Sequence, residues 1–223
     1  MKRITAFILA LSLCAAVLSS CSLSDTFLTL LGFDTYDYEG EEVIGYPDID
    51  GDEVSSLCEM IKILSVNTPF LPEFDNAADA VSVCRDSILN YMLCTSFSKY
   101  SGNPELIQET KKEYPTLQII SVIPCEDFEN CVYTYFGGNV KLSHKSSELF
   151  RYLEKADAYT AVSVPIESSV VTNVISCEKT ERTYRLRFTN TLGDITSPEY
   201  YAFIIRREDG SCYFKSLTAT SNE

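Results

Sequence analysis

The clearest hydrophobic pattern in the chain lies between residues 75 and 101. Apolar side chains recur there at three- and four-residue intervals, at Ala77, Val81, Cys84, Ile88, Tyr91 and Met92. This spacing places them on one face of an α-helix, opposite a face of polar residues. Asp75 suits the N-cap position, and Gly102 suits the residue that follows the last turn. The pattern predicts one helix over 75–101, with an apolar face wide enough to lie across a sheet.

Three shorter helices are also predicted, one before this helix and two after it. Apolar residues at helical spacing predict the first over 54–64, before a linker that contains two prolines. Asn103-Pro104-Glu105 provides a cap, a proline at the first helical position and an acid in the first turn, and this helix should end near Tyr114. Pro124 opens the third helix, which Gly137-Gly138 ends.

Apolar and polar residues alternate in the second half of the chain. The segment Thr183-Tyr-Arg-Leu-Arg-Phe188 has the period of two that is typical of a half-buried strand. Glu208-Asp-Gly-Ser211 suits a hairpin turn in which Gly210 takes a positive φ. A short strand is predicted over 117–123, and further strands over 159–164, 170–178, 182–190, 200–207 and 211–217. The segment 146–155 is compatible with either a helical turn or extended chain.

This order of elements predicts an α+β domain with N-terminal helices packed on a C-terminal antiparallel β-sheet. Over about residues 75–217 it resembles the NTF2-like (cystatin-like) fold, in which helices and sheet enclose a cone. The resemblance rests on the helix over 75–101, the Asn103-Pro-Glu105 helix start and the closing strands 200–207 and 212–217. It implies a pocket between the sheet and the helices. A generic antiparallel α+β sandwich is the structural alternative.

The N-terminus has the composition of an export signal. Lys2 and Arg3 precede an apolar run from Ile4 to Leu18. The following Leu18-Ser-Ser-Cys21 resembles the lipobox of bacterial lipoproteins. The resemblance implies cleavage before Cys21, a diacylglyceryl group on its sulfur and attachment to the extracytoplasmic face of the cell membrane. An ordinary cleaved signal with an incidental cysteine is the alternative.

Charge and spacing predict how the rest of the chain is organised. Residues 22–53 contain ten acidic side chains and no lysine or arginine, so repulsion should keep this segment extended. We therefore predict a signal peptide (1–20), an acidic flexible tether (21–53), a short helix with a linker (54–74) and an NTF2-like domain (75–223). Asp48-Ile-Asp-Gly-Asp52 lacks the glycine position of a calcium loop, so no metal site is predicted.

The formal net charge of the chain is −14. A nucleic acid is a poor partner for such a surface, because binding one requires clustered lysine and arginine side chains. The same charge repels anionic lipid headgroups. Membrane lipid attached through Cys21 is therefore the predicted membrane contact, with a second copy of the chain or an envelope protein as the further partners considered.

Nine cysteines are present, of which Cys14 would leave with the leader and Cys21 would carry lipid. The other seven are Cys58, Cys84, Cys94, Cys125, Cys131, Cys177 and Cys212. An odd number cannot all pair within one chain. Two cysteines six residues apart on one helix, such as Cys125 and Cys131, lie about 9 Å apart, beyond the ~7 Å limit for a bridge. We interpret most of them as small buried apolar residues.

No arrangement of catalytic residues is predicted from the sequence, and no cofactor. The single histidine, His144, lies in a polar turn where a surface position is expected. Nucleotide-binding and hydrolase fingerprints are absent from the sequence. The acids Glu126 and Asp127, and Asp157 with Tyr159, are candidates for acid–base chemistry, but the default place for such acids is the solvated surface.

Three functional hypotheses follow. The first is a lipid-anchored extracytoplasmic protein that binds a small molecule or a protein without transforming it. The second is an isomerase or dehydratase that uses a buried acid and a tyrosine, which requires a carboxyl group with a raised pKa in an apolar cavity. The third is a structural accessory subunit of a cell-envelope complex, which requires an exposed apolar patch or a homodimer through an open sheet face.

Overall fold

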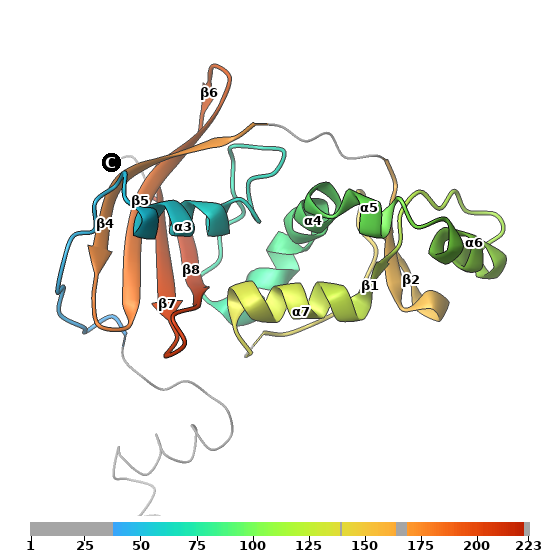
Figure 1. The fold of residues 1–223 in the computed structure, drawn as a ribbon, viewed down its shortest axis with the longest axis horizontal. Coiled ribbons are helices and arrows are strands. Elements are labelled where there is room, and N and C mark those ends of the chain that lie inside the picture. The colour runs from blue at the N-terminus through green and yellow to red at the C-terminus, as the bar shows by residue number, and fades with distance from the viewer. Residues whose placement is uncertain (1–37, 139, 164–168, 221–223) are drawn as a thin grey trace, which may run out of the picture. The chain divides into compact units, whose positions relative to one another are not determined.

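The computed structural model describes residues 38–138, 140–163 and 169–220. The chain divides into two compact units, residues 1–41 and 42–223, and all the elements described below belong to the second. Helices lie in its N-terminal half, and its C-terminal part is an antiparallel sheet, as Figure 1 shows. The predicted α+β class is confirmed. The cone of the NTF2-like fold stays a prediction.

The helices follow the predicted positions closely, with one interruption. They are α3 (Asp52–Ile61), α4 (Ala77–Thr95), α5 (Phe97–Tyr100), α6 (Pro104–Glu113) and α7 (Cys125–Phe136), with a 3-10 turn η1 (Glu154–Ala156). The predicted helix over 75–101 is two helices, because Ser96 leaves the helical region with φ −132° and ψ 42°. Gly137 ends α7 with a positive φ of 79°, as expected for a glycine at that position.

The cap of α4 also differs from the prediction. Asn76, not Asp75, is the N-cap, and its side-chain oxygen accepts a hydrogen bond from the backbone N–H of Asp79. Its amide nitrogen also donates to the Asp79 carboxylate at 3.1 Å. The reason is backbone geometry, because Asn76 is the extended residue that directly precedes the first helical turn.

The strands form two antiparallel sheets. The larger has the order β4-β5-β7-β8, with the short strand β6 on β5, and the smaller has the order β1-β3-β2. Their bounds are β1 (Ile123–Pro124), β2 (Phe150–Leu153), β3 (Ala158–Ala161), β4 (Val171–Lys179), β5 (Thr183–Leu192), β6 (Ile195–Thr196), β7 (Tyr200–Arg206) and β8 (Cys212–Ala219). Gly210 has a φ of 84° in the turn before β8, which confirms that hairpin.

The smaller sheet corrects two predictions. The strand predicted over 159–164 belongs to it as β3 instead of joining the C-terminal meander, and its last residue lies outside the described residues. The ambiguous segment 146–155 supplies its neighbour β2. Only the last residue of the strand predicted over 117–123 enters a strand, β1. Short strands carry little periodic signal, so their pairing depends on contacts with distant parts of the chain.

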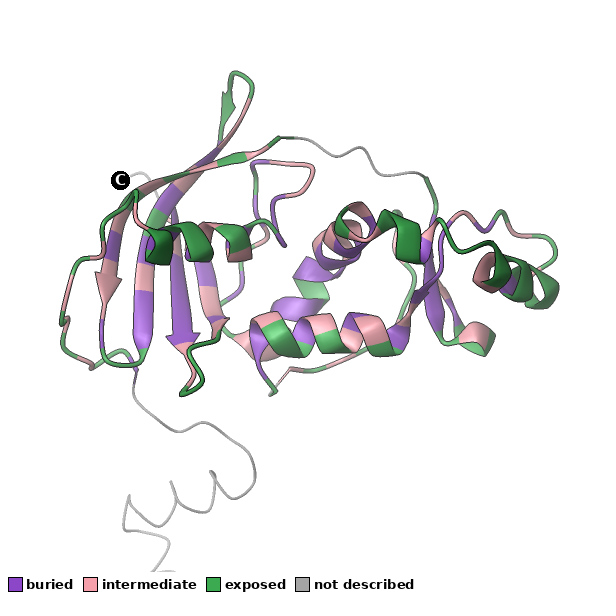
Figure 2. Ribbon diagram, in the orientation of Figure 1, coloured by how far each residue is buried: buried purple, intermediate pink, exposed green. Residues whose placement is uncertain are grey.

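One hydrophobic core joins both sheets to the helices. Leu186, Ala202 and Phe214, on the inner face of the larger sheet, are fully buried. The rings of Phe74, Phe136 and Phe214 meet edge-to-face or tilted, with centroids 5.7–6.4 Å apart. The same cluster continues through α4 and α7 to Phe150 and Tyr159 of the smaller sheet. Figure 2 shows the buried residues along these helices and strands.

The folded unit begins earlier in the chain than the predicted domain. It starts at Glu42, so it overlaps the predicted acidic tether as far as Glu53. Val54, Leu57 and Ile61 of α3 join the main core. The linker after α3 is fixed as well, because the backbone N–H of Leu71 donates to the Tyr200 hydroxyl at 2.8 Å.

The α4 cap provides a test of these boundaries. We expect Asn76→Ala to lower the free energy of unfolding by about 1 kcal/mol, because a backbone N–H of the first turn loses its acceptor. Asp75→Ala is the matched control and should change it by less than about 0.5 kcal/mol. Urea denaturation of the two variants measures both values. Equal losses of stability in the two variants, or a larger loss in Asp75→Ala, would indicate that Asp75 is the N-cap.

Candidate functional site

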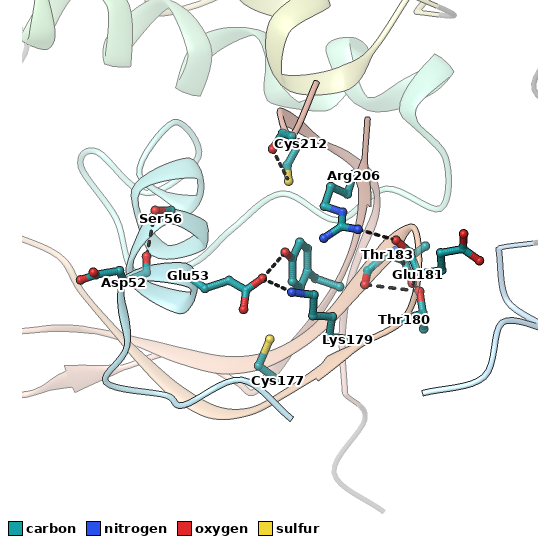
Figure 3. Close-up of polar contacts among 12 residues, drawn as sticks. Asp52, Glu53, Ser56, Cys177, Lys179, Thr180, Glu181, Thr183, Arg206 and Cys212 are labelled. Atoms are coloured by element: carbon teal, nitrogen blue, oxygen red, sulfur yellow. Dashed lines mark hydrogen bonds and ion pairs between the residues drawn. The ribbon is translucent and has the colours of Figure 1, made fainter. Parts of the chain in front are cut away.

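The first polar cluster of interest fixes α3 to the larger sheet. Glu53, in the first turn of α3, accepts hydrogen bonds from Lys179 Nζ at 2.6 Å and from the Tyr184 hydroxyl. Lys179 and Tyr184 are directly opposed residues on β4 and β5. We call these three residues the Glu53 clamp. Figure 3 shows Glu53 and Lys179 meeting beside α3, with Arg206 close by.

The surroundings of the Glu53 clamp decide the charge state of its members. The hydrogen bonds from Lys179 and then Tyr184 lower the pKa of Glu53 below its ordinary value of 4.5. Burial, and then the hydrogen bond to Glu53, raise the pKa of Tyr184 to about 12. At neutral pH the clamp therefore holds an ionised, paired carboxylate and a neutral phenol.

This state does not suit acid catalysis. The pKa values of two carboxyl groups, Glu53 and Asp209, are both lowered. The isomerase or dehydratase hypothesis requires a shift in the opposite direction. The role that the geometry supports for Glu53 is attachment of α3 to the ends of β4 and β5.

A groove lies between β4 and α3. We call it the β4 groove; its volume is about 480 Å³, and its lining residues are Ile49, Asp50, Ser55, Cys58, Thr172, Asn173 and Val174. One wall is β4 and the others are α3 and the chain that leads into it. Figure 1 shows this leading segment passing beside β4 before α3 begins. The Glu53 clamp holds α3, and so this wall, in place.

The outer edge of β4 is mostly unpaired within the described residues. Gly45 pairs with Lys179 at one end of the strand, through backbone hydrogen bonds of 2.8–3.2 Å that also include Ile44. At the opposite edge of the sheet, Phe74 likewise pairs with Leu217 of β8 through an isolated bridge. A bulge at Ile175 interrupts the register of β4, and its side chain is 45% exposed. Such an edge presents backbone donors and acceptors to an incoming strand.

The acidic run at 48–52 forms the turn that starts α3. Asp48 accepts hydrogen bonds from the backbone N–H of Asp50, at its side chain, and of Gly51, at its carbonyl. Gly51 is the N-cap of α3. Within the described ranges, no three histidine, cysteine, aspartate or glutamate side chains gather closely enough to hold a metal ion.

His144 differs from the surface histidine that was predicted. Its side chain is only 20% exposed. Nε2 lies 3.0 Å from a carboxylate oxygen of Glu129 on α7, and Nδ1 lies 3.1 Å from the hydroxyl of the buried Tyr159. A carboxylate only accepts, so Nε2 carries a proton and donates it in a hydrogen bond to Glu129. Tyr152 stacks on the ring with centroids 5.5 Å apart.

The prediction for His144 failed because its partners are distant in sequence. Glu129 and Tyr159 each lie fifteen residues away, one on either side. The polar sequence around His144 describes its own loop and carries no sign of these contacts. The arrangement satisfies both ring nitrogens and fixes the loop to α7 and β3.

The residues that the sequence suggested as acid–base pairs have separate partners in the structure. Glu126 is exposed, whereas Asp127 forms an ion pair with Lys99 at 2.8 Å. Asp157 accepts a hydrogen bond from the Tyr152 hydroxyl at 3.3 Å, and the Tyr159 hydroxyl meets His144 instead. None of these contacts places a free carboxylate beside a free tyrosine.

The cysteines of the folded unit behave as apolar residues. Cys84, Cys125 and Cys177 are buried and form no disulfide. Cys125 and Cys131 share α7, as predicted. Burial raises the pKa of both Cys125 and Cys131 to about 12, and that of Cys177 to about 11. These thiols stay protonated at neutral pH, and the protonated thiol is a poor nucleophile.

Comparison with other proteins adds no identity. Searches of protein-family models, of curated proteins and of solved structures find no match to the chain. The predicted lipid-attachment residue Cys21 lies outside the described residues. Among the helices that the structure describes, none is long and apolar enough to cross a membrane.

The lowered pKa of Glu53 provides a pH test of the clamp. A group whose pKa is lowered by folding stabilises the protein above its ordinary pKa, and this contribution disappears as pH falls through the lowered pKa. At neutral pH we expect Glu53→Gln to cost about 0.5–1 kcal/mol, because the carboxylate is 41% exposed and water screens its ion pair. Below pH 4.5 the difference from wild type should shrink toward zero.

Urea denaturation across this pH range measures the effect. Glu59→Gln is the matched control, since Glu59 is on the same helix and its ion pair with Lys62 is more exposed. It should change stability little at any pH. A Glu53→Gln difference that grows as the pH falls would contradict the assigned charge state.

Proposed function

We propose that the chain is a lipid-anchored, extracytoplasmic binding protein that holds an extended, positively charged segment of a partner protein in the β4 groove. The lipobox resemblance at Leu18-Ser-Ser-Cys21 supports the anchor and the location. The outer edge of β4, most of which is unpaired among the described residues, is the observation that carries the binding function.

The geometry of β4 favours an extended ligand. Adding a strand to a free sheet edge satisfies backbone donors and acceptors on both partners, and side-chain pockets beside the edge then provide specificity. The β4 groove opens beside Thr172, Asn173 and Val174, away from the residues where Gly45 already pairs. Exposed apolar side chains at Ile49 and Val171 offer contacts for alternate residues of the ligand.

Charge favours a basic ligand. Asp50 lines the β4 groove, and no lysine or arginine is among its lining residues. Lys179, the last residue of β4, already forms an ion pair with Glu53 at 2.6 Å. The formal charge of −14 attracts cations over a longer range and repels acidic segments.

The titratable groups support binding over catalysis. The carboxylate of the Glu53 clamp is ionised and paired, and the buried thiols have raised pKa values. His144 has both ring nitrogens engaged. An enzyme that uses a buried acid and a tyrosine remains the alternative, and turnover of ester, glycoside or isomerase substrates by the purified chain would favour it.

A homodimer is the second way to use the same edge. Two β4 edges could pair antiparallel about a two-fold axis, which is the isologous arrangement expected of such dimers. The free edge and the exposed Ile175 favour this candidate. Sedimentation analysis separates it from the first proposal, because a dimer through β4 would exclude the peptide.

Peptide binding tests the proposed groove. We expect a fluorescent peptide of alternating lysine and valine to bind, and the matching glutamate–valine peptide not to bind. Asp50→Lys should weaken binding of the basic peptide about tenfold, because one attractive charge becomes repulsive. Added salt should weaken the wild-type interaction as well.

The control for this test is Glu109→Lys, which makes the same change in net charge on the exposed face of α6. It should leave the peptide affinity nearly unchanged. Amide NMR shifts on peptide addition should centre on residues 172–174. Equal losses for both variants, or shifts centred on another strand, would rule out the β4 groove.

The anchor has its own test, which does not depend on the peptide. In a bacterial host, mass spectrometry should find the chain cleaved before Cys21 and carrying an acyl mass. Cys21→Ser should abolish the acyl mass and release the protein from the membrane fraction. Cys14→Ser is the control and should retain both, because Cys14 would leave with the signal peptide. An intact N-terminus that keeps Met1 would overturn the anchor.

A further inference from the structure

A second, smaller pocket lies on the three-stranded sheet. Arg151 of β2 and Thr160 of β3 are directly opposed in the register of these strands, so their side chains lie on the same face. The pocket has a volume of about 200 Å³ and is lined by Leu117, Gln118, Arg151, Thr160, Ala161 and Val162. We call it the Thr160 pocket. It is separate from the β4 groove, with which it shares no residue.

Thr160 is unusual among the buried polar residues. It is only 3% exposed, and its hydroxyl has no hydrogen-bond partner. Buried hydroxyl groups nearly always have a partner, since leaving water without one is unfavourable. Because Thr160 is among the residues that line the pocket, a bound molecule could supply the missing partner.

Arg151 supplies a positive charge beside this hydroxyl. Its side chain is exposed, and it makes no ion pair with any carboxylate of the described residues, whereas Arg185 and Arg187 pair with Glu178 and Glu199. A guanidinium is suited to a carboxylate because its planar donors match the two oxygens.

The rest of the lining limits the size and charge of the ligand. Leu117 and Val162 offer apolar contact for a short hydrocarbon chain. A phosphate brings about two negative charges, and the lining residues offer one cationic side chain, in a protein of net charge −14. A single carboxylate with a few carbons fits the volume, the charge and the lining.

We propose that the Thr160 pocket binds a short aliphatic monocarboxylate. Arg151 pairs with the carboxylate, the Thr160 hydroxyl donates to one of its oxygens, and the aliphatic part contacts Leu117 and Val162. The carboxylate could belong to a free short-chain acid or to the C-terminus of a peptide, because the two present the same chemistry. The proposal does not depend on the β4 groove or on the lipid anchor.

Calorimetric titration of the full chain in detergent micelles with butyrate tests the proposal. Butyrate should bind, and inorganic phosphate should bind at least about tenfold more weakly. Thr160→Val and Arg151→Gln should each weaken butyrate binding by about tenfold or more. Lys155→Gln is the matched control, because it removes an exposed positive charge on nearby η1 that does not line the pocket. It should leave the affinity nearly unchanged.

Thermal unfolding without ligand distinguishes loss of a contact from loss of the fold. Thr160→Val keeps the shape of the side chain and removes a hydroxyl that has no partner, so its Tm should equal or exceed that of wild type. Butyrate should raise the Tm of wild type and leave that of Thr160→Val unchanged. A lower Tm for the unliganded variant would show that the hydroxyl is already engaged, and would overturn the proposal.

Two peptides identify the source of the carboxylate. A short peptide with a free C-terminus that binds more tightly than butyrate would identify a chain end, and weaker binding would identify a free acid. The same peptide with an amidated C-terminus should not bind. Binding of the amidated peptide, equal binding of phosphate, or an equal loss in Lys155→Gln would each refute the carboxylate site.

Discussion

The packing of α4 and α7 against each other and against β8 is the interaction on which the rest of the unit depends. Leu186, Ala202 and Phe214 of the larger sheet are fully buried in the same core, and each large apolar side chain contributes roughly 1.5–3 kcal/mol when it leaves water. The same two helices also cover Phe150 and Tyr159, so one continuous core fixes both sheets. The two proposed binding sites lie at the margins of this core, where backbone and polar groups reach the surface.

Polar contacts at these margins determine which side chains and backbone groups remain able to bind a ligand. Glu53 and His144 are the residues that a search for catalytic groups would select, yet each already contacts neighbours on separate elements. Glu53 joins α3 to two strands, and His144 joins its loop to α7 and β3. By contrast, most of the outer edge of β4 has no strand partner among the described residues, and the Thr160 hydroxyl has no hydrogen-bond partner. These unpaired groups are where the two proposed ligands would bind.

The sequence predicted much of the fold, because periodicity and capping are local properties. The helix start at Asn103-Pro-Glu105, the end of α7 at Gly137 and the hairpin at Gly210 all follow from backbone preferences of the residues present. The failures are equally physical. Ser96 interrupts an apolar pattern that continues on both sides of it, and the short β2 and β3 pair with each other instead of joining the larger sheet. A strand of four residues contains too few side chains to specify its partner.

The sequence by itself determined the α+β class, the order of the main elements, the negative charge and the resemblance of the leader to a lipobox. It could not locate either candidate site. The partners of Glu53 lie 126 and 131 residues away, and Thr160 faces Arg151 only because β2 and β3 pair in one register. The tertiary structure decided these environments, since burial and hydrogen bonding depend on which distant residues meet, and no local pattern of side chains records that.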